Sequence, residues 1–432
     1  MHICYVADAR SPIAKNWISH FVARNHEVTV ISSYPCKSNE IPGARIIEFP
    51  FAFSSLSRLR RSGHATNSQW QPSKPSLSRL DTEKLLAVSN QIRTWIAPLQ
   101  IERKRVPLSA IMHDLRPDIV HAMRLPFEGF LAAAAVDETP LLISVWGNDF
   151  TLFANRSRRL SKITDTALLR ADGLHCDCRR DIELAFARGF SRIKPWRVLP
   201  GGGGIQIARY QELQVNRELL CRYKIPADVP LVINPRGVRV YVHNDSFFRS
   251  IPAVLKQVPN AFFIAVGMSG NSVAERWIRQ SAVGNSVRLL PTVSREELAI
   301  LFTASAVSVS PSSHDGTPNT LLESMACGCF PVAGELESVR EWISDGDNGL
   351  LCDPRDASAL ARSIVRALRD SDLRAQAAAR NRMLIGNRAD YLSVMCEAQA
   401  LYEEVVCSKL KREPAALAAN GRVCSPLRMV TL

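Results

Sequence analysis

The sequence predicts an α/β protein made of two doubly wound domains, each with a parallel sheet covered by helices on both faces. Its 432 residues exceed what one hydrophobic core usually supports, so two domains are expected. Short apolar runs of strand length alternate with amphipathic stretches of helical period, and this alternation builds parallel sheets. The content of 46% hydrophobic and 22% charged residues is that of an ordinary globular protein.

A first strand, helix, strand unit is predicted within residues 2–35. The run HICYVAD is expected to form a buried strand, ARSPIAKNWISHFVARNH repeats apolar residues at helical spacing, and EVTVISSYP supplies the next strand. Later strands are expected in DIVHAM, LLISVWGND and WRVLPGGGG, with helices in FEGFLAAAAV and RRDIELAFARGF. Together these elements predict an N-terminal domain over residues 1–205.

A second alternation follows a linker near residues 205–228. Its strands are expected in PADVPLVINPRG, AFFIAVG, VRLLP, AVSVSPS and CFPVAG, and its helices in SFFRSIPAVLKQV, REELAILFTA and LLESMACG. This predicts a C-terminal domain over residues 226–385. A helix at 386–411 is expected to pack back toward the N-terminal domain, and residues 412–432 are expected to be disordered because they lack a usable period.

Several classes of protein are excluded at this level. No stretch approaches the roughly 18 consecutive apolar residues of a membrane span. The N-terminus MHICYVADAR reaches Asp8 before an apolar core develops, so no signal peptide is expected. The eleven scattered cysteines are typical of buried thiols in a reducing cytoplasm. We expect no metal site, either at Cys327 and Cys329 or at residues 175–178, because neither offers a second ligand pair.

The net charge of +13 is concentrated in one segment. Residues 51–110 carry ten basic and three acidic side chains, a net charge of +7. Anionic lipid head groups attract such a segment by about 1 kcal/mol per basic residue near the surface. A solvated basic loop without a partner is an equal alternative. No helix-turn-helix, zinc finger or RNA-binding sheet motif is present, so no nucleic acid partner is expected.

The segment HDGTPNTLLESMACGCFPVAG, residues 314–334, carries the strongest chemical signal. A polar turn leads from a strand into a helix, and Gly316 permits unusual backbone angles there. Pro318 suits a first helical position, and Thr317, Asn319 and Thr320 are all capping residue types. The free N–H groups and the positive dipole end of such a helix favour an anion such as a diphosphate.

This segment, followed by ESVREWISDGDNGLLCDPRDASALARSI, resembles the retaining nucleotide-sugar glycosyltransferases of the GT-B fold, in the group 1 or family 4 branch. The shared signature is an acid, seven residues, a second acid, a small-residue helix end and a DG-x-NGLL turn. The resemblance is close over about 50 residues and weaker over most of the chain, except residues 51–110 and the tail. It implies two Rossmann-like domains that face each other across a cleft. It also implies a hexosyltransferase-like activity that needs neither metal nor cofactor and uses a nucleotide-diphosphate sugar as substrate.

The resemblance also assigns roles to residues of the donor site. Asp315 should lie beside the donor sugar, Glu323 should hold the ribose hydroxyls, and the backbone of residues 316–321 should contact the sugar and diphosphate. Carboxylates suit these tasks because each accepts several hydrogen bonds. In the alternatives, Asp315 is a simple turn acid and Thr320 with Glu323 forms a capping box. The expected donor-binding residues are Arg236, Arg239, Asn244, Gly267, Asp315, Gly316, Thr317, Asn319, Thr320, Leu321 and Glu323.

The segment NPRGVRVYVHND departs from the family pattern. Family members usually carry an arginine and, five residues later, a lysine that neutralise the leaving diphosphate. The alignment places Arg239 at the arginine and Asn244 at the lysine. Arg236 in the same loop could supply the missing charge through bidentate contact with phosphate oxygens. One of the two arginines is a surface residue in the alternative interpretation.

A second departure lies in the segment SVWGND of the N-terminal domain. Trp146 stands where the family often has a histidine that reaches the donor sugar, whereas Asp149 keeps the acid. Asp149 is therefore a candidate polar group at the reaction centre, and His121 is another, with a purely structural role as its alternative. Together with Asp315 these are the candidate catalytic residues. The expected acceptor-side residues are Arg10, Ser11 and Trp146.

The leading hypothesis is a cytoplasmic enzyme that moves a sugar, with retention of configuration, to a glycan or lipid-linked acceptor. Synthesis of cell-surface polysaccharide or glycolipid is the expected setting, with peripheral docking at the inner face of the membrane. One alternative is another GT-B activity, such as an epimerase or phosphorylase. A second is a non-catalytic paralogue that binds a nucleotide sugar or glycan, which the departures at Trp146 and Asn244 favour.

Overall fold

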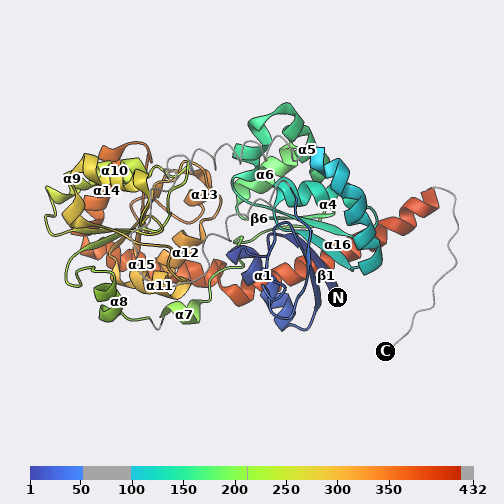
Figure 1. The fold of residues 1–432 in the computed structure, drawn as a ribbon, viewed down its shortest axis with the longest axis horizontal. Helices are drawn as coiled ribbons and strands as arrows, with labels where there is room; N and C mark the ends of the chain where they lie inside the picture. The colour runs from blue at the N-terminus through green and yellow to red at the C-terminus, as the bar shows by residue number, and fades with distance from the viewer. Residues whose placement is uncertain (52–98, 212, 420–432) are drawn as a thin grey trace, which may run out of the picture.

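The computed structural model describes residues 1–51, 99–211 and 213–419, and it shows two α/β lobes (Figure 1). Each lobe is built on a sheet whose strand pairs are all parallel. The sheets have seven and six strands, in the orders β3-β2-β1-β4-β5-β6-β7 and β10-β9-β8-β11-β12-β13. The predicted architecture of two doubly wound domains is therefore confirmed.

The N-terminal sheet contains every strand that the apolar runs predict in this half, and two more. Its strands are β1 (His2–Ala7), β2 (Glu27–Ser32), β3 (Arg45–Glu48), β4 (Ile119–Ala122), β5 (Leu141–Val145), β6 (Gly173–Cys176) and β7 (Trp196–Val198). The strands β3 and β6 were not predicted because neither stands out in the sequence as an apolar run. The helices are α1 (Pro12–Ala23), residues 99–115, the π-helical turn η2 (Leu125–Gly129), α4 (Phe130–Ala135), α5 (Arg158–Arg170) and α6 (Arg179–Ala187).

The second sheet likewise contains the predicted strands and one short addition, β13. Its strands are β8 (Leu231–Asn234), β9 (Phe262–Ala265), β10 (Val287–Leu289), β11 (Val307–Ser310), β12 (Phe330–Gly334) and β13 (Leu350–Cys352). Its helices are α7 (Ile207–Gln211), α8 (Arg217–Arg222), α9 (Asn244–Leu255), α10 (Ser272–Ser281), α11 (Arg295–Ala304), α12 (Asn319–Ala326), α13 (Glu337–Arg340), α14 (Ala357–Arg369) and α15 (Ser371–Arg388). Separate apolar clusters cover the two faces of this sheet, as parallel sheets require.

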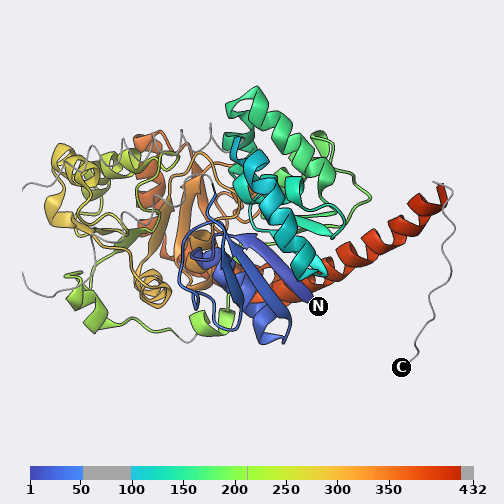
Figure 2. The same ribbon diagram turned by 45° about the vertical axis from the view of Figure 1, so that its right-hand side comes forward.

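The chain returns to the N-terminal lobe through its last helix, α16 (Tyr391–Ala419), as Figures 1 and 2 show. The segment between α15 and α16 is hydrogen-bonded to the linker. The Ile205 amide donates to the Ala389 carbonyl at 2.7 Å, and the Ile205 carbonyl accepts from the Tyr391 amide at 2.9 Å. Beyond it, Leu401, Tyr402 and other residues of α16 join the apolar cluster that contains α1 and one face of the first sheet.

One expectation for the C-terminus needs correction. Residues 412–419 were predicted to belong to a disordered tail, but they continue α16 up to Ala419. The segment has no apolar period, and Pro414 disfavours a helix interior, yet four of these eight residues are alanine, the strongest helix former, and they can extend a helix that already exists.

No helix within the described ranges is long and apolar enough to cross a lipid bilayer. Most of the predicted basic insertion at residues 51–110 lies outside the described residues. Its last part belongs to the helix at 99–115.

Candidate active site

The two lobes meet directly at the acid-rich turn. Gly147, after β5, lies so close to Gly316 that a side chain on Gly147 would overlap the Gly316 backbone. Asp177, after β6, contacts the same glycine, and its carbonyl accepts from the Thr317 hydroxyl at 2.5 Å. Because all three loops follow the carboxyl ends of parallel strands, the site lies where such sheets place their ligands.

Arg236 occupies the centre of this region. One of its terminal nitrogens donates to the Asp315 carboxylate, and the other donates to the Thr320 hydroxyl at 3.2 Å. The Arg236 side chain is 8% exposed and that of Asp315 is 14% exposed, so the ion pair is largely shielded from water. The guanidinium therefore lies at the first turn of α12, where a helix N-terminus favours an anion.

The other two predicted donor-binding residues of this loop region, Arg239 and Asn244, lie elsewhere. Arg239 is exposed and donates to the Tyr241 hydroxyl at 2.9 Å. Asn244 is fully buried at the start of α9, where it accepts from Asn234 at 2.9 Å and donates to the Gly237 carbonyl at 2.7 Å. Asn244 thus holds the loop that carries Arg236. The structure brings Arg236 to Asp315, although the alignment had given Arg239 the family's position.

Glu323, in the middle of α12, is 5% exposed. Arg295 donates to its Oε1 over 3.1 Å, and the Tyr210 hydroxyl is 3.5 Å from the same oxygen. Burial raises the pKa of Glu323, while Arg295 and Tyr210 act in the opposite direction. The capping-box alternative is wrong, because Pro318 is the N-cap of α12 and no side chain caps it.

Asp149 belongs to the N-terminal lobe and is 1% exposed. It accepts from Arg124 at 3.1 Å and from the Trp146 amide at 3.0 Å. Burial raises the pKa of Asp149 to about 6, and Arg124 limits the rise. The indole Nε1 of Trp146 is buried without a hydrogen-bond partner in the described structure, so it remains available as a donor to a ligand.

Sequence reasoning missed an acidic pair beside this turn, Asp177 and Asp181. Burial, and then the charge of Asp181, raise the pKa of Asp177 well above its usual range. Arg180 donates to Asp181 at 2.8 Å and to the Gly147 carbonyl at 2.6 Å. The side-chain ligand atoms of Asp177, Cys178 and Asp181 lie within 4.8 Å of one another, a spacing that can hold a metal ion. The signal for this pair was the polar run DCRRD directly after a strand.

His121 lies in the N-terminal core, 0% exposed. Its ring nitrogens are hydrogen-bonded to the Tyr402 hydroxyl at 2.5 Å and to Ser144 Oγ at 2.7 Å. Burial, and then the nearby His175, lower the pKa of His121 well below its usual range. Contact with a substrate would require both hydrogen bonds to break, so the structure favours the structural role and corrects the catalytic assignment.

The remaining predicted residues line the same region in several ways. Arg10, after β1, pairs with Asp8 at 2.9 Å and lies over the Tyr34 ring, while Ser11 precedes α1 as its N-cap without a side-chain cap bond. The Asn319 amide contacts Gly202 in the PGGGG loop. Gly267 adopts a φ of 74° beside Gly237.

Several buried polar atoms in the facing loops of the two lobes have no hydrogen-bond partner among the described residues. In a folded protein such atoms are rare, so these groups are suited to bind a polar ligand. Within the described part of the chain, those near the facing loops of the two lobes are Trp146 Nε1, Asn148 Oδ1, Asp181 Oδ2, Arg236 Nε, His243 Nε2 and Ser312 Oγ.

Comparison with known families agrees with this arrangement. Residues 224–383 match the model of the glycosyl transferases group 1, and residues 77–177 match the glycosyl transferase 4-like model. The chain belongs to the group 1 glycosyltransferases. Within this family, the turn at Asp315 and helix α12 lie in the matched region, as do Arg236 and Glu323.

Solved structures show the same fold for this glycosyltransferase. Sucrose-phosphate synthase from Thermosynechococcus elongatus superposes with a TM-score of 0.70 at 17% identity, over 94% of this chain and 100% of that one. Anabaena HepE, solved with UDP-glucose, gives a TM-score of 0.67 at 15% identity, over 93% and 99% of the two chains. These likenesses establish the two-domain GT-B architecture.

Curated relatives are distant and match only in part. The O-antigen chain mannosyltransferase B of Escherichia coli is 36% identical over 22% of this chain and 24% of its own length. The lipopolysaccharide core biosynthesis glycosyltransferase LpsE of Rhizobium meliloti is 30% identical over 36% of this chain and 44% of its own length. This glycosyltransferase therefore spans less than half of the length of these relatives.

Proposed function

We propose that this glycosyltransferase moves a sugar from a nucleotide-diphosphate sugar to a glycan or lipid-linked acceptor, with retention of anomeric configuration. The observation that carries the proposal is the position of Arg236, between Asp315 and the first turn of α12. A cation, a helix N-terminus and a carboxylate at one point suit a donor that has a diphosphate next to a sugar.

The leaving group determines what the site must do. As the bond between the anomeric carbon and the diphosphate breaks, negative charge develops on the phosphate oxygens. Arg236 and the N–H groups at the start of α12 would stabilise this charge, because donors fixed in place before the reaction need little reorganisation. A donor phosphate that binds Arg236 would also free the carboxylate of Asp315. That carboxylate would then accept hydrogen bonds from hydroxyls of the sugar.

The other groups have complementary tasks in this proposal. Glu323 would accept hydrogen bonds from the two ribose hydroxyls, beside the contacts that Arg295 and Tyr210 make with its Oε1. From the opposite lobe, the unpartnered Trp146 indole N–H would donate to the transferred sugar or the acceptor. Asp149 would position that tryptophan through its hydrogen bond to the Trp146 amide.

We propose that transfer needs no metal ion. The acidic cluster beside Gly316 contains a guanidinium, that of Arg180, which already neutralises Asp181. Burial, and then the charge of Asp181, raise the pKa of Asp177, which opposes the ionised form that a metal ion requires of a carboxyl ligand. Both features oppose a divalent cation at this position, and Arg236 offers positive charge at the expected diphosphate.

Cell-surface polysaccharide or glycolipid synthesis is the proposed setting, because the curated relatives include proteins named for O-antigen and lipopolysaccharide core synthesis. Docking on the inner face of the membrane fits the helix at 99–115. There, Leu99 and Val106 are 56% and 66% exposed, and Arg103 and Arg105 are exposed beside them. Apolar and basic side chains together suit an anionic lipid surface.

A non-catalytic protein that binds a nucleotide sugar or glycan is the second candidate. The observation in its favour is Asn244, which is buried in the loop and supplies no charge where the family usually has a lysine. The donor site would then bind its ligand with a single cation and fail to stabilise the departing diphosphate.

One experiment separates the two candidates. The purified protein is incubated with UDP-, GDP-, ADP- and dTDP-sugars, with and without cell-envelope lipid, and release of the nucleoside diphosphate is measured. Release with one donor supports transfer, whereas binding of a donor without release under any condition supports the second candidate. Glu323→Gln should weaken nucleotide binding by about tenfold, because a charged hydrogen-bond acceptor is lost. The exposed Glu218→Gln is the matched control.

A further inference from the structure

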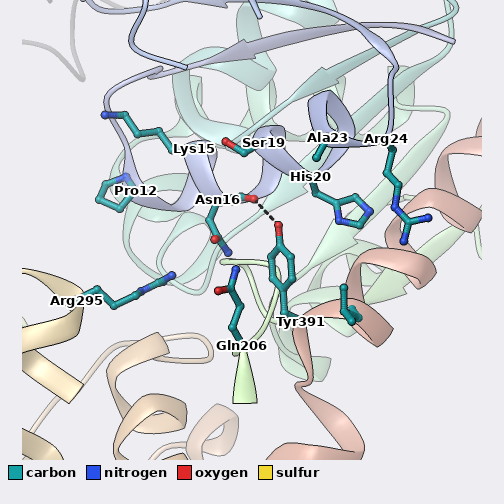
Figure 3. Close-up of a pocket in the computed structure, with 11 residues that line it drawn as sticks. Pro12, Lys15, Asn16, Ser19, His20, Ala23, Arg24, Gln206, Arg295 and Tyr391 are labelled. Atoms are coloured by element: carbon teal, nitrogen blue, oxygen red, sulfur yellow. Dashed lines mark hydrogen bonds between the residues drawn. The ribbon is translucent and has the colours of Figure 1, made fainter. Parts of the chain in front are cut away.

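A cavity lies between the lobes, next to α1 (Figure 3). Its volume is about 600 Å³. The N-terminal lobe contributes α1, the linker contributes Gln206, the C-terminal lobe contributes Arg295, and the start of α16 contributes Tyr391. The remaining lining residues are Pro12, Lys15, Asn16, Ser19, His20, Ala23, Arg24 and Leu392.

The lining carries three permanent cations, together with His20, and no acidic side chain. Lys15 already pairs with Glu40 at 2.5 Å, and Arg295 pairs with Glu323. Arg24 is exposed and has no ion-pair partner among the described residues. An unmatched guanidinium in a concave site gives the cavity a net positive character that attracts an anion.

His20 supplies a second and independent indication of a ligand. The residue is 6% exposed, and its Nε2 atom is buried without any hydrogen-bond partner in the described structure. The ring packs edge-on against Tyr391 at a centroid distance of 5.8 Å, which fixes its position in the wall. Because buried polar atoms are almost always hydrogen-bonded, an unpartnered nitrogen here is best satisfied by a bound molecule.

The polar groups around these cations suit hydroxyls. The Tyr391 hydroxyl donates to the Asn16 carbonyl at 3.0 Å, the contact drawn in Figure 3, and the Asn16 amide donates to the Gly202 carbonyl at 2.5 Å. These bonds hold the wall in shape, while Ser19 and Gln206 also face the cavity. A volume of about 600 Å³ lies within the range of small-ligand sites.

We propose that this cavity binds a small molecule with a phosphate monoester, of the size of a phosphorylated sugar, with its phosphate at Arg24 and His20. A guanidinium binds phosphate through paired N–H donors, and the histidine nitrogen adds a third hydrogen bond. The proposed phosphate position at Arg24 and His20 differs from the diphosphate position at Arg236, although the cavity and the donor site share the pair of Arg295 and Glu323. Since α1 and Arg295 belong to different lobes, the bound molecule bridges them.

The test uses the full-length protein, with inorganic phosphate and glucose 6-phosphate as probes, in calorimetric titrations. The expected result is saturable binding that Arg24→Gln weakens by at least about tenfold, because a charged hydrogen bond is lost. Arg276→Gln, an exposed arginine of α10 outside the cavity, is the matched control and should leave binding unchanged. Preference for glucose 6-phosphate would identify a sugar phosphate as the ligand class, and equal binding would identify the phosphate group alone.

A variant of the donor site keeps this result separate from the function proposed above. Arg236→Gln should retain binding of both probes, whereas loss of binding in Arg236→Gln but not in Arg24→Gln would place the phosphate at the donor site and overturn the proposal. If neither probe bound the protein, the proposal would also be overturned. Nuclear magnetic resonance of histidine-labelled protein provides a local readout, since the His20 ring signals should shift on titration and remain unshifted if the cavity stays empty.

Discussion

Arg236 and Asp315 form a shielded ion pair in which the arginine also donates to Thr320, 3.2 Å away, in the first turn of α12. The pair links the loop after β8 to the loop after β11, the two strand ends that face the other lobe. A phosphate at this point would exchange one anionic partner of the guanidinium for another. The positive charge that would stabilise the leaving diphosphate is thus held in place before a donor binds.

The first prediction concerns this arginine. Arg236→Gln should lower kcat/KM by about 10²–10³, the usual cost of losing one donor that stabilises a developing anion. Release of nucleoside diphosphate measures the effect. Arg239→Gln is the matched control, because it removes the same charge from an exposed position three residues away and should change kcat/KM by less than about threefold. A larger effect at Arg239 than at Arg236 would show that the family alignment identifies the phosphate ligand correctly.

The second prediction concerns pH and Asp149. Its pKa is raised from 3.8 to about 6 because burial penalises the charged carboxylate. Only the ionised form accepts hydrogen bonds at both oxygens, so activity that depends on this turn should rise with pH through about 6. Asp149→Asn should remove that inflection from the profile of kcat/KM against pH, and an unchanged inflection would assign it to another group.

The Asp149 carboxyl also makes the free energy of unfolding depend on pH. A pKa that is higher in the folded state favours the protonated folded protein, so this contribution is complete below about 3.8 and is lost as pH rises through about 6. Urea unfolding of Asp149→Asn and of the unchanged protein between pH 5 and 7.5 measures it. As pH rises, the unchanged protein should lose unfolding free energy relative to Asp149→Asn.

The third prediction concerns the contact between the lobes. Gly147→Ala places a Cβ on the Gly316 backbone, so the lobes can no longer approach as closely. Activity should fall by at least about tenfold, since catalytic groups from both sides must be held within a fraction of an ångström. Small-angle scattering should show a more extended protein. Thermal unfolding should give an unchanged melting temperature. Gly284→Ala is the control, because a Cβ there would meet its nearest neighbour at an ordinary 3.8 Å.

The comparison of sequence and structure shows where local patterns suffice. Apolar runs identified most of the strands, because parallel strands buried on both faces need continuous apolar stretches. The same patterns did not distinguish Arg236 from Arg239. That choice depends on the course of the loop, which Asn244 determines through its bonds to Asn234 and Gly237, and such bonds leave no periodic trace in the sequence.

Two other differences have the same origin. One hydrogen-bond partner of His121 is Tyr402, which lies 281 positions later in the chain, so the burial of His121 depends on how α16 returns to the first lobe. The acidic pair at Asp177 and Asp181 acquires its role from contact with Gly316 in the other lobe. Residues that depend on such distant contacts cannot be assigned from spacing alone, whereas the turn at Asp315 carries its chemistry within a few positions.

The fourth prediction tests how α16 is fastened to the N-terminal lobe. The Tyr402 hydroxyl accepts from the Trp17 indole at 2.9 Å, is hydrogen-bonded to His121 at 2.5 Å and donates to the Tyr5 hydroxyl at 3.2 Å. Tyr402→Phe keeps the stacking of this ring on Phe21, at 4.6 Å, and removes only the hydroxyl.

The buried Trp17 N–H would then lose its partner, and an unsatisfied buried donor costs about 1–3 kcal/mol. The free energy of unfolding in urea should fall by that amount. Tyr241→Phe is the control, because it removes a hydroxyl that binds the exposed Arg239 and should cost less than about 0.5 kcal/mol. Equal stability of the two variants would show that α16 is held by apolar contacts alone. A selective loss at Tyr402 would instead show that the buried hydroxyl couples the last helix to β1, β4 and α1.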